Sequence, residues 1–234
     1  MLNKIFDLNN SFFQTVSKIG YIWWMTILWL VTSIPIVTIG ASTTALIYTA
    51  MKYRHDEGYV TKNFFKSFKE NFKQSTLIWL IYLIVGFLIG IGMIFWNNYD
   101  APFSRVGYGV VIAVGIIYII SILYVFAIQS KFYNKIMDTI KYSVIMAFTN
   151  IKETFLMLLI IAGLVLINIF TNALVNFITL NFGMGLVTYL LGHHYERIFD
   201  KYIPEDLKAD YSLDPDYVDI DVDKHLEEII ENYQ

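Results

Sequence analysis

A long uncharged run near the N-terminus constrains this chain more than any other feature. No charged residue lies between Lys18 and Lys52, and most of the run 20–51 is apolar. A helix needs about 20 apolar residues to cross the ~30 Å hydrocarbon core of a bilayer. The run therefore predicts an integral membrane protein, and it is too long for a single straight crossing.

Two features interrupt this run. Pro35, in the triplet Ser33-Ile34-Pro35, lacks a backbone donor, and Gly40 is a poor helix former. We name Pro35 and Gly40 as a candidate helix-break motif. The pattern predicts one crossing over about 21–37, followed by a second, shorter helix from about residue 42.

Further uncharged runs predict the rest of the membrane domain. The chain is 56% hydrophobic, and its 18 Phe, 17 Tyr and 5 Trp are typical of a protein with aromatic belts at both membrane interfaces. We predict an all-α fold: a polytopic membrane helical bundle of about five transmembrane helices with amphipathic cytoplasmic helices. After the first, the predicted crossings are 74–99, 106–130, about 154–171 and 177–196.

An amphipathic segment precedes the second crossing. At 100° per residue, its phenylalanines share one arc and its lysines cluster opposite, which predicts an in-plane helix with aromatics toward acyl chains and lysines toward lipid phosphates. The alternative is that the aromatic arc packs on a partner or on the bundle itself. The candidate lipid or partner face consists of Phe64, Phe65, Phe68 and Phe72 with Lys62, Lys66, Lys69 and Lys73.

The distribution of basic residues predicts the orientation. Segments 52–73, 131–152 and 197–208 hold 6, 4 and 3 Lys/Arg, whereas loops 97–105 and 172–176 hold 1 and 0. By the positive-inside rule, the first group and the C-terminus are cytoplasmic. Five crossings, the count we prefer, put the N-terminus outside; a sixth, made by the short helix after the break, puts it inside.

The C-terminal part differs in charge from the rest. Residues 1–203 hold 15 Lys/Arg against 9 Asp/Glu, and residues 204–234 hold 2 against 11. We therefore predict a membrane domain, 1–203, and an acidic cytoplasmic tail, 204–234. The tail carries a short amphipathic helix, and the apolar residues that could dock it are Leu226, Ile229, Ile230 and Tyr233.

Chemistry-bearing patterns are scarce. The chain has no cysteine, and the predicted crossings hold polar residues but no acidic or basic ones before Glu196 at the end of the last, which argues against ion-coupled transport and against acid–base hydrolysis. His193 and Glu196 share a helical face, but no third metal ligand is evident. We predict no catalytic, cofactor-binding or metal site, hence no enzyme, and no nucleic-acid partner; membrane lipid is the expected contact.

Several short motifs lie around the break and beyond it: Trp29-Leu30, SIPIVTIG at 33–40, Ala45-Leu46 with Tyr48, the Phe64/Phe65/Phe68 helix with NFKQ at 71–74, and AF-NIK-T at 147–154. Through these motifs, the last of them a weaker match, the chain resembles the YesL family, bacterial membrane proteins that share a domain of unknown function. Ala41 stands where the family usually has proline.

The resemblance implies a function class rather than a site. YesL-like proteins are typically encoded beside carbohydrate ABC importers, and the family has no accepted catalytic residues. The resemblance implies a multi-pass protein of the bacterial plasma membrane. It implies that this protein is an accessory to a carbohydrate ABC importer and that the importer's subunits are its partners. The alternatives are a membrane subunit that takes part directly in oligosaccharide transport and, last, a membrane enzyme. The partner, the sugar and the oligomeric state are not predicted.

Overall fold

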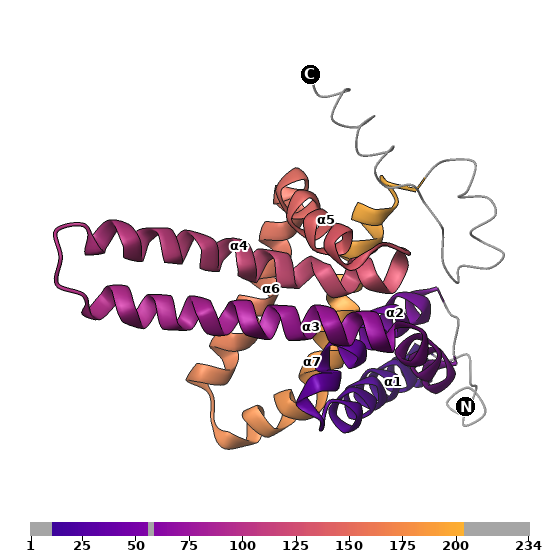
Figure 1. Ribbon diagram of the computed structural model, residues 1–234. Coiled ribbons are helices and arrows are strands. Elements are labelled where there is room, and N and C mark those ends of the chain that lie inside the picture. Colours follow the sequence, from indigo (N-terminus) through magenta and orange to yellow (C-terminus); the bar gives the residue numbers. More distant parts are fainter. Residues whose placement is uncertain (1–10, 56–58, 204–234) are drawn as a thin grey trace, which may run out of the picture.

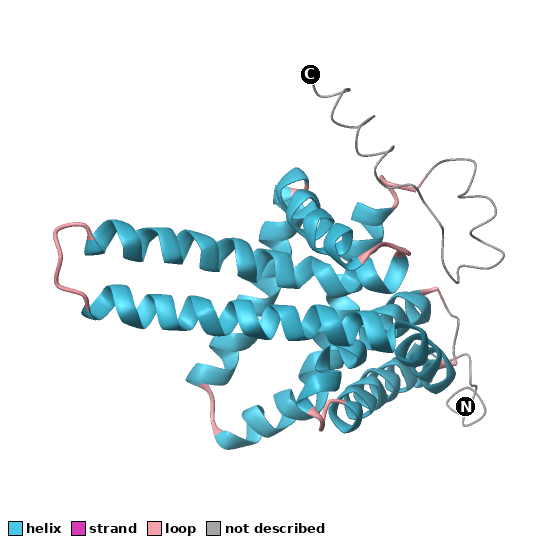
Figure 2. Ribbon diagram, viewed as in Figure 1, coloured by secondary structure: helices cyan, strands magenta, loops and turns pink. Residues whose placement is uncertain are grey.

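The structure is a computed structural model that describes residues 11–55 and 59–203. Seven α-helices and one 3-10 helix follow one another, and no strand occurs in these two ranges (Figures 1 and 2). The all-α prediction is confirmed. The predicted tail helix, with its docking residues, lies outside the described residues. The elements are α1 (Ser11–Thr32), η2 (Ile36–Thr38), α2 (Ile39–Arg54), α3 (Val60–Asn98), α4 (Ser104–Lys131), α5 (Ile136–Thr149), α6 (Ile151–Phe170) and α7 (Ala173–Phe199).

Four of these helices are long and apolar enough to cross a membrane, namely α3, α4, α6 and α7. They coincide with the predicted second to fifth crossings, so the chain is a polytopic membrane helical bundle. The helix α1, which holds the predicted first crossing, is not among the four. Its tryptophans and threonines lower its mean hydropathy, because neither side chain transfers to hydrocarbon as readily as leucine or isoleucine.

The helix break lies between Thr32 and Ile39. The helix α1 ends at Thr32, and Pro35 precedes η2 with φ −73°. Gly40 does not end a helix: it is the second residue of α2, which begins three residues before the predicted start at residue 42. A Cβ atom at Gly40 would come within 2.6 Å of Trp79 Cβ and would also collide with the Ser75 carbonyl oxygen. Glycine at this position therefore lets α2 approach α3 closely.

The two helices on either side of the break are antiparallel. The rings of Tyr21 and Tyr53 lie 5.1 Å apart, and Trp29 Nε1 donates to Thr43 Oγ1 at 3.1 Å. The second half of α1 is also tied to α3, since Trp24 Nε1 donates to Thr61 Oγ1 at 2.8 Å. The chain thus turns back after the break. Because neither α1 nor α2 is among the four helices long and apolar enough to cross a membrane, the choice between five and six crossings stays a prediction. The start of α1 and the end of α2 lie at the same end of the bundle.

The amphipathic segment is not a separate in-plane helix. It forms the first part of α3, a continuous helix of 39 residues, which corresponds to ~58 Å at 1.5 Å per residue. The prediction of a distinct helix is wrong because no glycine or proline interrupts 59–85, so nothing ends the helix where the charges stop. Figure 1 shows α3 and α4 as a long hairpin whose loop end stands away from the other helices.

The helix α2 lies at the centre of the bundle. Most of its residues are buried, and it contacts α1, α3, α4 and α7. One apolar cluster joins α1, α2 and the start of α3 around Met25, Leu46 and Phe64. A larger cluster contains buried residues of α2 and of each helix from α3 through α7. Buried aromatic rings from α4 and α7, such as Tyr124 and Phe199, give it much of its volume.

Candidate functional site

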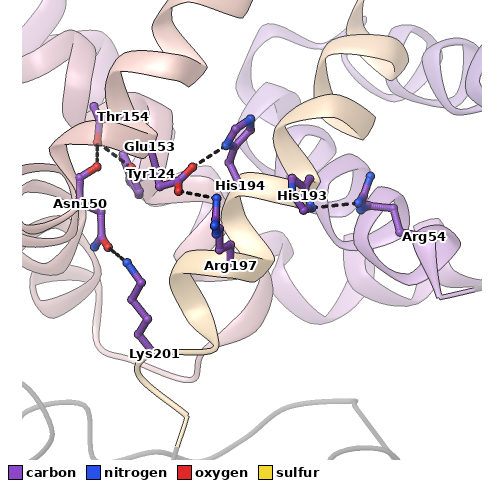
Figure 3. A network of polar contacts seen from close by, with 9 residues as sticks. All are labelled: Arg54, Tyr124, Asn150, Glu153, Thr154, His193, His194, Arg197 and Lys201. Carbon is purple, nitrogen blue, oxygen red and sulfur yellow. Dashed lines mark hydrogen bonds and ion pairs between the residues drawn. The ribbon is translucent and has the colours of Figure 1, made fainter.

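Charged side chains gather where α2, α6 and α7 meet, and Glu153 is the centre of one group (Figure 3). Glu153 lies in the first turn of α6. Its Oε2 lies 2.7 Å from His194 Nδ1, and its Oε1 accepts from Arg197 Nη1 at 3.2 Å. The carboxylate side chain is only 13% exposed. Each of its oxygens therefore has a cationic or donor partner on α7, as a nearly buried carboxylate requires.

Arg54, the last residue of α2, is the centre of the second group. Its Nε donates to Glu196 Oε2 at 3.1 Å, and its Nη2 lies 3.3 Å from His193 Nδ1. The guanidinium also lies over the Tyr189 ring, 5.2 Å from the centroid. Gly192 makes room for it, since a Cβ atom there would lie 3.1 Å from Arg54 Cδ. This group fastens the end of α2 to α7.

The pairing with Arg54 bears on the metal ligands considered above. His193 and Glu196 do lie on the same side of α7, but both face the Arg54 guanidinium. A cation already fills the position that a metal ion would take. Within residues 11–55 and 59–203, no group of three or more His, Cys, Asp or Glu side chains is arranged to hold a metal ion.

A third polar junction connects the start of α6 with the residues that follow α7. Asn150 precedes α6 and accepts from Lys201 Nζ at 2.7 Å, while its own Nδ2 donates to the Tyr202 hydroxyl at 3.1 Å. One turn further along α6, the Thr154 hydroxyl lies 2.7 Å from the Tyr124 hydroxyl of α4. These contacts place α4, α6 and the end of α7 side by side (Figure 3).

Neutral polar side chains join the helices deeper in the bundle. Thr44 on α2 and Ser75 on α3 have hydroxyls 2.9 Å apart, and Gln129 Nε2 on α4 donates to Asn71 Oδ1 on α3 at 3.0 Å. Another set links three helices, since the Ser121 hydroxyl of α4 bonds both Tyr82 of α3 and Ser143 of α5. Such side chains bond across helices in membrane proteins because lipid offers no other partner.

The candidate lipid or partner face is divided between the interior and the surface. Phe64 is completely buried and Phe68 half-buried against the α1–α2 cluster, so the alternative of packing on the bundle holds for these two. Phe65 and Phe72 are 40% and 38% exposed. The lysines all lie outside the core, Lys66 half-buried and the other three exposed.

The sequence analysis missed the charged groups for a specific reason. Arg54 and Glu196 are 142 residues apart in sequence, and Glu153 and His194 are 41 apart. Each lies among other charged residues at the end of a long uncharged run. Such a position indicates a helix end, but it does not indicate which distant residue will be the partner. The inference that the chain lacks a paired acid and base is therefore wrong for Glu153 and His194, which the fold brings together.

The N-terminal part of the chain is similar to one known protein family. Residues 22–93 match the model of a protein family described as "Protein of unknown function, DUF624". This match covers α2, the second half of α1 and most of α3, including the helix break. No curated protein and no solved structure matches the chain. The description of the family states no activity, so the carbohydrate association implied by the resemblance remains a prediction.

Proposed function

We propose that this chain is a non-catalytic membrane protein that binds another membrane protein through the loop-side half of the α3–α4 hairpin. The observation that carries the proposal is the position of that half, which stands clear of the other helices (Figure 1). Its side chains are large, apolar and exposed, for example Phe87, Ile94 and Val106. They cover no part of the bundle's own core.

Gly90 distinguishes this surface from one that only faces lipid. The spacing Gly86-x-x-x-Gly90 places both glycines on α3 about one turn apart. Gly86 already packs against α4, because a Cβ atom there would lie 2.7 Å from the Tyr118 hydroxyl. Around Gly90 nothing lies within 4 Å, and Phe87 and Ile94 flank it on the same face. Small residues between larger ones let a second helix approach closely in a membrane.

The resemblance to YesL-like proteins supplies the identity of the partner in this proposal. The partner is a subunit of a carbohydrate ABC importer in the bacterial plasma membrane, and this chain is its accessory. A non-catalytic role is supported by how the polar groups are used: Glu153 pairs with His194 on α7, and Arg54 pairs with Glu196, so both pairs hold helices together. Neither of the two cavities that we describe below is lined by Glu153 or His194.

A matched pair of glycine variants tests the proposal. Gly163 on α6 is also half-buried with nothing within 4 Å, so Gly163→Leu is the control for Gly90→Leu. The full chain, purified in mild detergent from its native membrane, is expected to bring importer subunits with it in stoichiometric yield by mass spectrometry. Gly90→Leu should lower that yield several-fold, and Gly163→Leu should not. Absence of importer subunits, or equal loss with both variants, contradicts the proposal.

A second candidate function is direct participation in oligosaccharide transport. One cavity favours it, an open groove of about 600 Å³ between the end of α1 and the α6–α7 hairpin. Its lining combines the Trp29 ring with the amides of Asn168 and Asn176. Aromatic rings and amides together suit the apolar faces and hydroxyls of sugars. Trp29→Leu should then abolish sugar uptake in proteoliposomes without lowering recovery of importer subunits.

A further inference from the structure

A second cavity lies where α3 meets the linker between α4 and α5. It measures about 770 Å³, and we call it the α3–α5 groove. The residues that matter for its chemistry are Lys73, Leu77, Asn134, Lys135, Met137 and Asp138. The two walls come from segments some 60 residues apart, and Gln74 Nε2 on α3 ties them together by donating to the Asn134 carbonyl oxygen.

The groove lies at the level of the membrane surface. Lys73 is the last charged residue on α3 before the run 74–99, which holds no charge. Leu77 follows one turn later, about 6 Å further along the axis, and is 48% exposed. The exposed side chain of Met137 lies on the opposite wall. The groove therefore offers cations at headgroup depth and apolar side chains toward the acyl chains.

Several donors in the groove have no acceptor. Asn134 Nδ2 is buried and has no hydrogen-bond partner among residues 11–55 and 59–203. Lys73 and Lys135 are both exposed, and neither forms an ion pair with a described residue. The helix α5 begins at Ile136. Its N-cap residue is Lys135, whose ammonium group can only donate, so no side chain of the N-cap accepts a hydrogen bond from the first N–H groups of the helix. The first backbone N–H groups of a helix favour an anion.

We propose that the α3–α5 groove binds the phosphate headgroup of an anionic phospholipid. Two ammonium groups, an unpaired amide donor and a helix N-terminus converge where a lipid phosphate would lie. Asp138 is the one acidic residue of the lining, and its carboxylate repels the phosphate less than the two ammonium groups attract it. The apolar wall of Leu77 and Met137 suits a lipid rather than a soluble phosphate ester, because it would otherwise remain in contact with water.

The test measures lipid binding to the full chain in detergent by native mass spectrometry, with phosphatidylglycerol as the probe and phosphatidylcholine as the neutral comparison. The variant Lys73→Gln/Lys135→Gln should lose about 30-fold in affinity for phosphatidylglycerol. The control Lys62→Gln/Lys69→Gln also removes two positive charges, both from the part of α3 outside the groove. Its affinity for phosphatidylglycerol should fall about threefold or less. Asp138→Asn should bind phosphatidylglycerol more tightly, because it removes the repelling carboxylate.

Two outcomes would overturn the proposal. Equal losses in the two double variants would show that only the net charge of the segment matters. Displacement of phosphatidylglycerol by millimolar inorganic phosphate, with no loss in phosphatidylcholine binding, would show that the groove takes a soluble phosphate instead. The lysine variants change exposed side chains, and Asp138→Asn replaces a half-buried side chain by one of the same shape, so circular dichroism and gel filtration should report an unchanged fold.

Discussion

Arg54 and Glu196 form an ion pair at 3.1 Å between the last residue of α2 and the last turn but one of α7. Their side chains are 22% and 18% exposed, so water screens the pair only in part. The contact closes the bundle between its N-terminal unit, α1 to α3, and its C-terminal hairpin, α6 to α7. It links the end of α2, a helix of only 16 residues, directly to α7.

We expect Arg54→Met to destabilise the protein by about 2 kcal/mol, because Glu196 then loses its charged hydrogen-bond partner in a poorly hydrated site. Thermal unfolding in detergent should show the loss. Arg105→Met, at an exposed position beside the 97–105 loop, should leave the unfolding temperature unchanged. In a double-mutant cycle, Glu196→Gln should cost little more in the Arg54→Met background. Additive losses would mean that the two residues do not interact.

Gly40→Ala should destabilise the bundle by about 1–3 kcal/mol, since its methyl group collides with the Ser75 carbonyl oxygen and Trp79 Cβ. Both obstacles belong to the α3 backbone or lie next to it, so neither can rotate away. Gly90→Ala meets open space and should be neutral or slightly stabilising, because alanine is the better helix former. A neutral Gly40→Ala would show that α2 and α3 do not pack this closely.

Phe64→Ala should cost about 3–5 kcal/mol, because it empties a fully buried site between α1, α2 and α3. Phe65→Ala, at the adjacent and 40% exposed position, should cost about 1 kcal/mol or less. Denaturant unfolding in detergent compares the two. Similar small losses would favour the in-plane helix, in which all four phenylalanines face lipid.

Single cysteines test the orientation in a chain that has none of its own. Asn97→Cys, at the loop end of the α3–α4 hairpin, should react with an impermeant thiol reagent added to intact cells. Asn63→Cys, at the other end of α3, and Asp210→Cys should react only after permeabilisation, because basic segments stay in the cytoplasm. Labelling of Asn63→Cys in intact cells would reverse the orientation.

Deleting residues 204–234 should leave the membrane domain folded and raise its affinity for anionic vesicles. The deleted segment carries 11 acidic residues against 2 basic ones, and its apolar stripe is expected to dock on the basic segments 62–73 or 131–141. Circular dichroism and vesicle co-sedimentation measure the two effects. An unfolded truncated protein, or one with unchanged lipid affinity, would refute the docking of the tail.

The sequence by itself determined the helices and the membrane. Uncharged runs of about 20 residues have few alternatives to a membrane helix, because hydrocarbon leaves backbone groups no partner except one another. Pro35 likewise marked the break from local chemistry alone. These properties depend on neighbours within one or two turns, so they can be read along the chain.

Only the tertiary structure decided which helices meet and what their polar residues do. The pairs Arg54–Glu196 and Glu153–His194 join residues far apart in sequence, and no local pattern names such partners. The antiparallel return of α2 follows from contacts such as Trp29 with Thr43, and the close approach at Gly40 follows from packing against Trp79. The periodic Phe64 and Phe65 looked equivalent in sequence, yet α1 and α2 cover only one of them, because burial depends on which neighbour the fold supplies.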